Sequence, residues 1–143
     1  MSVYRKILVA LDNGEADKNL LAHVAKLAKV HDAELMLVHV ADGWVARNYE
    51  QMQLAESDEM KEDRGYLDKC AVSLQEQGLK VCVHLALGEP AKEILKLADT
   101  KQCDLIAMGG HGHRLLGDLV LGSAISEVRH HAKVPVLLVR AGT

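Results

Sequence analysis

Short apolar runs alternate with longer segments of helical periodicity along the chain. The runs at 7–11 and 35–40 are apolar almost throughout, which predicts strands covered on both faces. Helices are expected over residues 15–31 and 56–77, a third after Gly88-Glu89-Pro90, and a fourth from Ser123 to about residue 132. Three further strands are predicted, at 81–86, 104–108 and 136–139.

Repeated alternation of strand and helix predicts an α/β fold with a parallel sheet and helices on both of its faces. The 143 residues contain no internal repeat or linker, so we expect one domain spanning residues 1–143. Periodicity alone does not give the order of the strands in the sheet.

A glycine-rich stretch follows the predicted fourth strand and leads into the predicted fourth helix. Glycine lets the backbone approach a ligand closely, and Ser123 is a good N-cap residue for the helix. The free N–H groups and the dipole at a helix N-terminus favour anions. We therefore interpret the stretch as a site for a phosphate chain, with a flexible surface loop as the alternative. Its five glycines are Gly109, Gly110, Gly112, Gly117 and Gly122.

Two common phosphate-binding motifs do not fit this stretch. A P-loop requires Gly-Lys-Ser/Thr, and no lysine precedes Ser123. The dinucleotide fingerprint requires a third glycine where Leu115 stands, and it follows the first strand of its fold rather than a late one.

The spacing Gly109-x2-Gly112-x9-Gly122-Ser123 resembles the nucleotide motif of the universal stress protein family, in its ATP-binding branch. Segments 9–12, 88–91 and 134–140 resemble other parts of that family in the right order, so the resemblance covers essentially the whole chain. It implies a doubly wound five-stranded parallel sheet of order 3-2-1-4-5, like that of adenine nucleotide alpha-hydrolases. In that order a crevice opens at the carboxyl ends of the first and fourth strands.

The resemblance also implies which residues contact the nucleotide. Ala10 and Val40 would border the adenine through their backbone. Asp12 would lie near the ribose or bind a phosphate-bound Mg²⁺, and an Asx turn after the strand is the alternative role for its carboxylate. The phosphates would be held by Gly109, Gly110 and Gly112 and, at the helix N-terminus, by Gly122, Ser123 and Ala124.

The polar residues of the loop complete the candidate site. Arg114 is expected either to contact a phosphate or to lie in solvent. His111 and His113 could suggest a metal pair, but no third ligand stands nearby, so we interpret them as loop residues that touch ribose or phosphate. Residues 41–57, with Trp44 and Tyr49 among them, form either a lid over the base or an anchored loop.

Composition limits the kinds of binding partner and the cellular compartment that we expect for this protein. A net charge of −3 and 3% aromatic residues argue against a nucleic-acid partner. Three cysteines without a close pair indicate reduced thiols rather than a disulfide framework. With no signal peptide and no membrane-length apolar run, we expect a cytoplasmic protein without a membrane association.

Together these features predict an ATP-binding regulatory protein of the stress response. The alternative is a slow hydrolase of ATP or another adenine nucleotide. We assign no catalytic residue, because the loop lacks lysine and Asp118 is its only carboxylate. The apolar strand Val136–Val139 is expected at a sheet edge, which predicts a homodimer through that strand. A regulatory protein partner would remain to be found.

Overall fold

The computed structural model describes residues 3–41, 58–110 and 116–140 of the chain. Within these ranges, the strands form one parallel sheet of order β3-β2-β1-β4-β5, which confirms the expected order. The strands are β1 (Lys6–Ala10), β2 (Glu34–Ala41), β3 (Lys80–Leu87), β4 (Leu105–Gly110) and β5 (Val136–Arg140).

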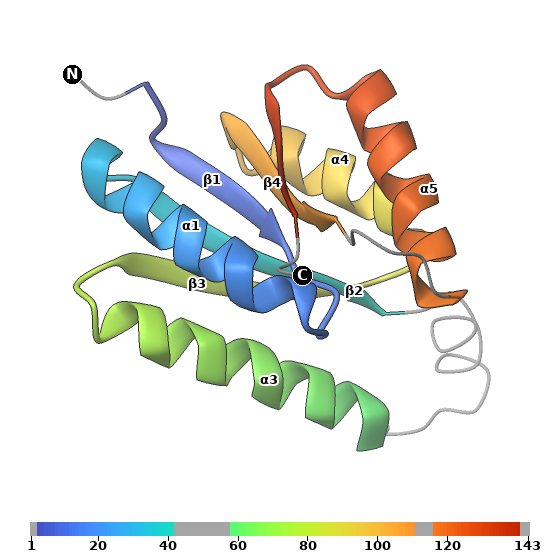
Figure 1. Ribbon diagram of the computed structural model, residues 1–143, viewed down its shortest axis with the longest axis horizontal. Helices are drawn as coiled ribbons and strands as arrows, with labels where there is room; N and C mark the ends of the chain where they lie inside the picture. Colours follow the sequence, from blue (N-terminus) through green and yellow to red (C-terminus); the bar gives the residue numbers. More distant parts are fainter. Residues whose placement is uncertain (1–2, 42–57, 111–115, 141–143) are drawn as a thin grey trace.

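Helices cover both faces of this sheet. Figure 1 shows α1 and α3 on one face and α4 and α5 on the other, so the expected doubly wound architecture is confirmed. The described helices are α1 (Ala16–His31), α3 (Asp58–Gln75), α4 (Pro90–Thr100) and α5 (Leu116–His131).

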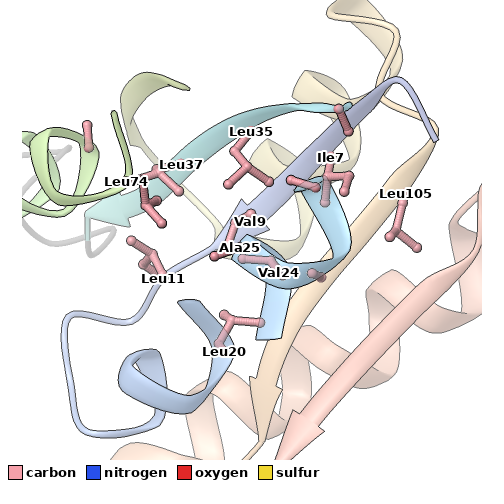
Figure 2. Packing of buried hydrophobic residues seen from close by; sticks show 14 of the residues in the cluster. Ile7, Val9, Leu11, Leu20, Val24, Ala25, Leu35, Leu37, Leu74 and Leu105 are labelled. Atoms are coloured by element: carbon pink, nitrogen blue, oxygen red, sulfur yellow. The ribbon is translucent and has the colours of Figure 1, made fainter. Parts of the chain in front are cut away.

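The two-residue period of the strands sends alternate side chains into two separate cores. Odd-numbered residues of β1, such as Ile7 and Val9, pack against α1 and α3, as Figure 2 shows for that core. Even-numbered residues of β1, such as Leu8 and Ala10, lie in the core under α4 and α5. Both sets are buried, which explains why the β1 sequence is apolar at every position.

The register places predicted site residues at the carboxyl ends of neighbouring strands. Ala10 ends β1 and pairs with Val38 of β2 and with Met108 of β4. Val40 and Gly110 lie two positions beyond these partners in β2 and β4, and Asp12 lies in the turn after β1. The carboxyl edge of the sheet therefore carries all four residues, although they are far apart in the sequence.

The predicted start of the fourth helix at Ser123 is wrong. Helix α5 begins at Leu116, so Gly117, Gly122 and Ser123 lie inside it. A glycine costs a helix only about 1 kcal/mol, which packing of an apolar face can outweigh. The buried apolar residues of α5 that are seen to pack in the core are Ala124 and Val128.

Both edge strands carry an exposed apolar side chain. Val83 of β3 is 37% exposed and Leu138 of β5, at the opposite edge, is 43% exposed. Edge strands with exposed apolar side chains invite pairing. None of the helices in the described ranges is long and apolar enough to cross a lipid bilayer.

Candidate functional site

The turn after β1 carries Asp12, the predicted ribose or metal ligand. Asp12 Oδ1 accepts the N–H of Gly14 at 2.9 Å, which is the Asx turn that we considered as its alternative role. Asn13 adopts a left-handed backbone with φ of 60°, which asparagine tolerates better than most residues. The turn is thus closed by the same carboxylate that is the candidate ligand.

A second carboxylate, Asp17, holds this turn from inside helix α1. Asp17 Oδ1 accepts the N–H of Asp12 at 3.0 Å, and Oδ2 accepts the N–H of Asn13 at 2.8 Å. Glu15, the residue before the helix, makes no capping bond with its side chain. Asp17 is 1% exposed, and no other charged residue in the described ranges is buried. We did not select it from the sequence, although an acidic residue in the first helical turn is a recognisable signal.

Helix α3 contacts the same turn through two side chains that are three residues apart. The Tyr66 hydroxyl donates to Asp17 Oδ2 at 2.9 Å. Asp63 Oδ1 accepts a hydrogen bond of 2.8 Å from Asn13 Nδ2. Residues three apart share one face of a helix, so α3 is fastened to the turn at two points.

His39 of β2 closes the network. Its Nδ1 lies 3.0 Å from the carbonyl oxygen of Leu11, and its Nε2 lies 3.5 Å from Asp63 Oδ2. A carbonyl oxygen only accepts hydrogen bonds, so Nδ1 is the protonated nitrogen. His39 is therefore a histidine with partners on both ring nitrogens.

Burial shapes the electrostatics of this cluster. Loss of hydration raises the pKa of Asp17 from 3.8 to about 6, and the neighbouring charge of Asp12 adds to the rise, although hydrogen bonds from the Asp12 backbone and from Tyr66 oppose it. Burial and the charge of Asp17 also raise the pKa of Tyr66. Two adjacent carboxyl groups give this edge of the sheet a negative potential that attracts cations.

The two glycines at the end of β4 differ in what surrounds them. A Cβ on Gly109 would lie 3.2 Å from Ala16 Cβ and 3.4 Å from the Ala16 carbonyl oxygen. A side chain at position 109 would therefore press on Ala16, so that β4 or α1 would have to shift slightly to keep packing. A Cβ on Gly110 would meet nothing within 4 Å, and the Gly110 backbone is not in the left-handed region. Neither packing nor backbone conformation in the described structure requires glycine at position 110.

The structure brings five of the predicted site residues together at the carboxyl edge: Ala10, Asp12, Val40, Gly109 and Gly110. By strand alternation, Ala10, Val40 and Gly110 belong to the face that carries α4 and α5. His111, Gly112, His113 and Arg114 lie outside the described residues, as do Trp44 and Tyr49 of the predicted lid.

Gly122, Ser123 and Ala124 do not form a helix N-terminus. They lie in the second and third turns of α5, where backbone N–H groups bond to carbonyl groups four residues earlier. Ala124 is also buried in the core under α4 and α5. The unbonded N–H groups of this helix are those of its first turn, from Leu116 onwards.

A cavity of about 470 Å³ lies at the opposite end of the sheet, between the C-terminal ends of α4 and α5. Its floor is apolar and includes Cys103 and Ile106, and its rim carries charges of both signs, among them Lys96 and Asp99. Burial raises the pKa of the Cys103 thiol to about 11, so this cysteine is protonated at neutral pH. None of the predicted site residues lines this cavity.

Among the described residues, no group of three or more His, Cys, Asp or Glu side chains is arranged to hold a metal ion. A complete protein cage of the kind that binds Zn²⁺ is thus absent from the described ranges. Mg²⁺ is commonly held differently, by one or two carboxylates together with phosphate oxygens and water. Asp12 fits that second mode.

Comparison with known proteins gives a consistent result over nearly the whole chain. The model of the universal stress protein family matches residues 3–140. Universal stress protein MJ0531 of Methanocaldococcus jannaschii is 32% identical over 142 residues, covering 97% of this chain and 84% of that protein.

Solved structures share the fold. The structure of MJ0577 from Methanocaldococcus jannaschii is 29% identical, covers 98% of each chain and has a TM-score of 0.81. A universal stress protein from Archaeoglobus fulgidus, solved in complex with dAMP, is 21% identical with a TM-score of 0.70, covering 95% of this chain and 98% of that one.

Proposed function

We propose that this chain, which belongs to the universal stress protein family, binds ATP at the carboxyl edge of its sheet and acts as a regulatory protein of the stress response. The base would lie beside Ala10 and Val40, and the phosphate chain would pass Gly110 towards the first turn of α5. Contacts from His111, Gly112, His113, Arg114, Gly122, Ser123 and Ala124 belong to the same proposal.

The observation that carries the proposal is the glycine at position 110. Gly110 ends β4, the strand that pairs with β1, and among the described residues nothing would lie within 4 Å of an added Cβ there. A glycine that the fold does not require leaves room for another molecule to approach the backbone. The position is also the carboxyl end of a central strand, where open α/β sheets bind their ligands.

The ligand class rests on two further points. The dAMP complex of the Archaeoglobus fulgidus protein, which has a similar fold, supports an adenine nucleotide. The glycine spacing resembles that of the ATP-binding branch, so we propose ATP, with AMP or ADP as the alternative ligand. A cation is needed with ATP, because the carboxylates of Asp12 and Asp17 would otherwise repel the phosphates. We propose Mg²⁺, with Asp12 as a protein ligand and phosphate oxygens and water as the others.

Slow hydrolysis of ATP is the alternative activity. Phosphoryl transfer requires cations that neutralise the developing charge and a residue that orients the nucleophile. Asp12, Asp17 and Asp63 are carboxylates described in this cluster, and all three already accept hydrogen bonds from residues of the turn. We therefore expect binding and signalling, rather than rapid turnover, to be the function of the site.

Calorimetry with ATP and Mg²⁺ tests the site through Gly110→Val. A valine fits the extended backbone and the space of the described structure, so the variant should fold, but its side chain would occupy the phosphate path. We expect a loss of affinity of at least about tenfold, which corresponds to about 1.4 kcal/mol. Gly65→Val is the matched control, because Gly65 is exposed on α3 and its Cβ also meets nothing within 4 Å. Equal affinity of the two variants would exclude the assignment.

We also propose a homodimer through β5, whose edge position and exposed Leu138 make it suited to strand pairing. Light scattering during size exclusion at micromolar concentration should give twice the mass of the chain. Leu138→Lys should shift the protein to the monomer, since a lysine on an edge strand opposes pairing. A monomeric wild-type protein would exclude this interface.

A further inference from the structure

We infer that Asp17 and Tyr66 are positioning residues for the Mg²⁺–nucleotide site, acting through the turn that carries Asp12; this inference rests on the function proposed above. The two residues come from different helices and meet at Asp17 Oδ2, which also accepts the N–H of Asn13. Neither side chain belongs to the predicted set of nucleotide contacts.

The geometry explains how a residue inside α1 controls Asp12. Asp17 binds two consecutive backbone N–H groups, one on each carboxylate oxygen, and these belong to Asp12 itself and to Asn13. The Asp12 side chain then bonds back to Gly14. The position of the Asp12 carboxylate is thus fixed on both sides by hydrogen bonds, so a change at Asp17 moves the candidate metal ligand directly.

Tyr66 fixes Asp17 in turn. A carboxylate that is 1% exposed has few partners other than protein groups, and the Tyr66 hydroxyl supplies one at 2.9 Å. Asp63, one turn earlier on α3, holds Asn13 from the same side. Helix α3 therefore sets the orientation of the turn, and displacement of α3 would alter the Mg²⁺ ligand without touching the nucleotide.

The chain offers a matched control for each residue. Asp104 also accepts two consecutive backbone N–H groups, those of Arg5 and Lys6 at 2.8 and 3.2 Å, but at the opposite end of β1. Tyr4 is a partly buried tyrosine that packs edge-on against His31, near the amino end of the same strand. Asp104→Asn and Tyr4→Phe thus remove comparable groups away from the site.

The experiment measures ATP affinity by calorimetry in Mg²⁺ and again in EDTA, for each folded variant. An amide at position 17 cannot accept both N–H groups and the hydroxyl, so Asp17→Asn should weaken binding in Mg²⁺ about tenfold, and Tyr66→Phe about threefold. In EDTA both variants should bind within about twofold of the wild type, because Asp12 then has no metal to hold. A general loss of structure would instead reduce the affinity for ATP equally in Mg²⁺ and in EDTA.

The outcomes separate this inference from the proposed function. If the wild type binds ATP, if Gly110→Val abolishes binding, and if Asp17→Asn and Tyr66→Phe keep the wild-type ratio of the two affinities, the positioning role is wrong and the site stands. If Asp104→Asn changes that ratio as much as Asp17→Asn, the effect is not specific to the turn and the inference also fails. A wild type that binds no ATP would overturn the proposed function itself.

Discussion

The two ends of strand β1 are held by the same device in different surroundings. At the amino end Asp104 accepts the N–H groups of Arg5 and Lys6, and at the carboxyl end Asp17 accepts those of Asp12 and Asn13. Asp104 is partly exposed, whereas Asp17 is 1% exposed and lies beside a second carboxyl group. Each aspartate thus makes two similar backbone hydrogen bonds, but only Asp17 is deprived of water.

The different burial of the two aspartates indicates different roles: Asp104 serves stability, whereas Asp17 serves function. A partly exposed carboxylate fixes the start of a strand with little loss of hydration, so burial of Asp17 is unnecessary for the hydrogen bonds alone. Burial of charge beside like charge is costly, and such arrangements cluster at functional sites. The carboxyl end of β1 also lies beside the end of β4, where no described residue would come within 4 Å of a Cβ added at Gly110. The carboxyl end of β1, where burial of charge is costly, is therefore the end at which we place the ligand.

The largest expected effect is a pH dependence of stability that comes from Asp17. Its folded pKa of about 6 exceeds the ordinary 3.8, so its contribution is most favourable below pH 3.8 and is lost as the pH rises through 6. The difference corresponds to roughly 3 kcal/mol, at about 1.4 kcal/mol per pKa unit. Urea unfolding of the nucleotide-free protein in EDTA, compared with Asp17→Asn between pH 4 and pH 7, measures it. A free-energy difference between the two proteins that stays constant with pH would contradict the raised pKa.

A smaller effect should distinguish the two glycines of the carboxyl end. Gly109→Val forces a side chain against Ala16, and overpacking of this kind costs about 1–3 kcal/mol. Gly110→Val should change the free energy of unfolding by less than about 0.5 kcal/mol, as for a substitution away from packed neighbours. Thermal or urea unfolding without nucleotide provides the comparison. Equal destabilisation by both variants would mean that position 110 is packed, and would remove the main support for the ligand path.

The smallest effect is expected at the amino end of β1. Asp104→Asn keeps one acceptor for the N–H groups of Arg5 and Lys6, and water can replace the other because Arg5 is exposed. We expect a loss of about 1 kcal/mol or less in the free energy of unfolding. Affinity for ATP should not change. A loss of unfolding free energy as large as that of Gly109→Val would show that the two ends of β1 are equally sensitive to substitution, which would contradict the difference between them.

The sequence by itself determined the architecture of this protein. Continuous apolar runs such as residues 7–11 are typical of a parallel sheet covered by helices on both faces. The apolar pattern therefore already predicted a sheet between two layers of helices. The strand order came from family resemblance, and the observed sheet has that order. The start of α5 was predicted wrongly, because the glycines and Ser123 were interpreted as a loop and an N-cap, whereas a helix tolerates a glycine at a cost of about 1 kcal/mol.

Only the tertiary structure decided how the site is supported. Asp17, Tyr66 and Asp63 carry no motif, and their contacts join distant parts of the sequence: Tyr66 contacts Asp17 over 49 positions and Asp63 contacts Asn13 over 50. The contrast between Gly109 and Gly110 is likewise invisible in the sequence, where the two are identical neighbours. Periodicity reports which face a residue occupies, whereas the neighbours on that face depend on how distant segments pack, and the properties of a buried carboxylate are set by those neighbours.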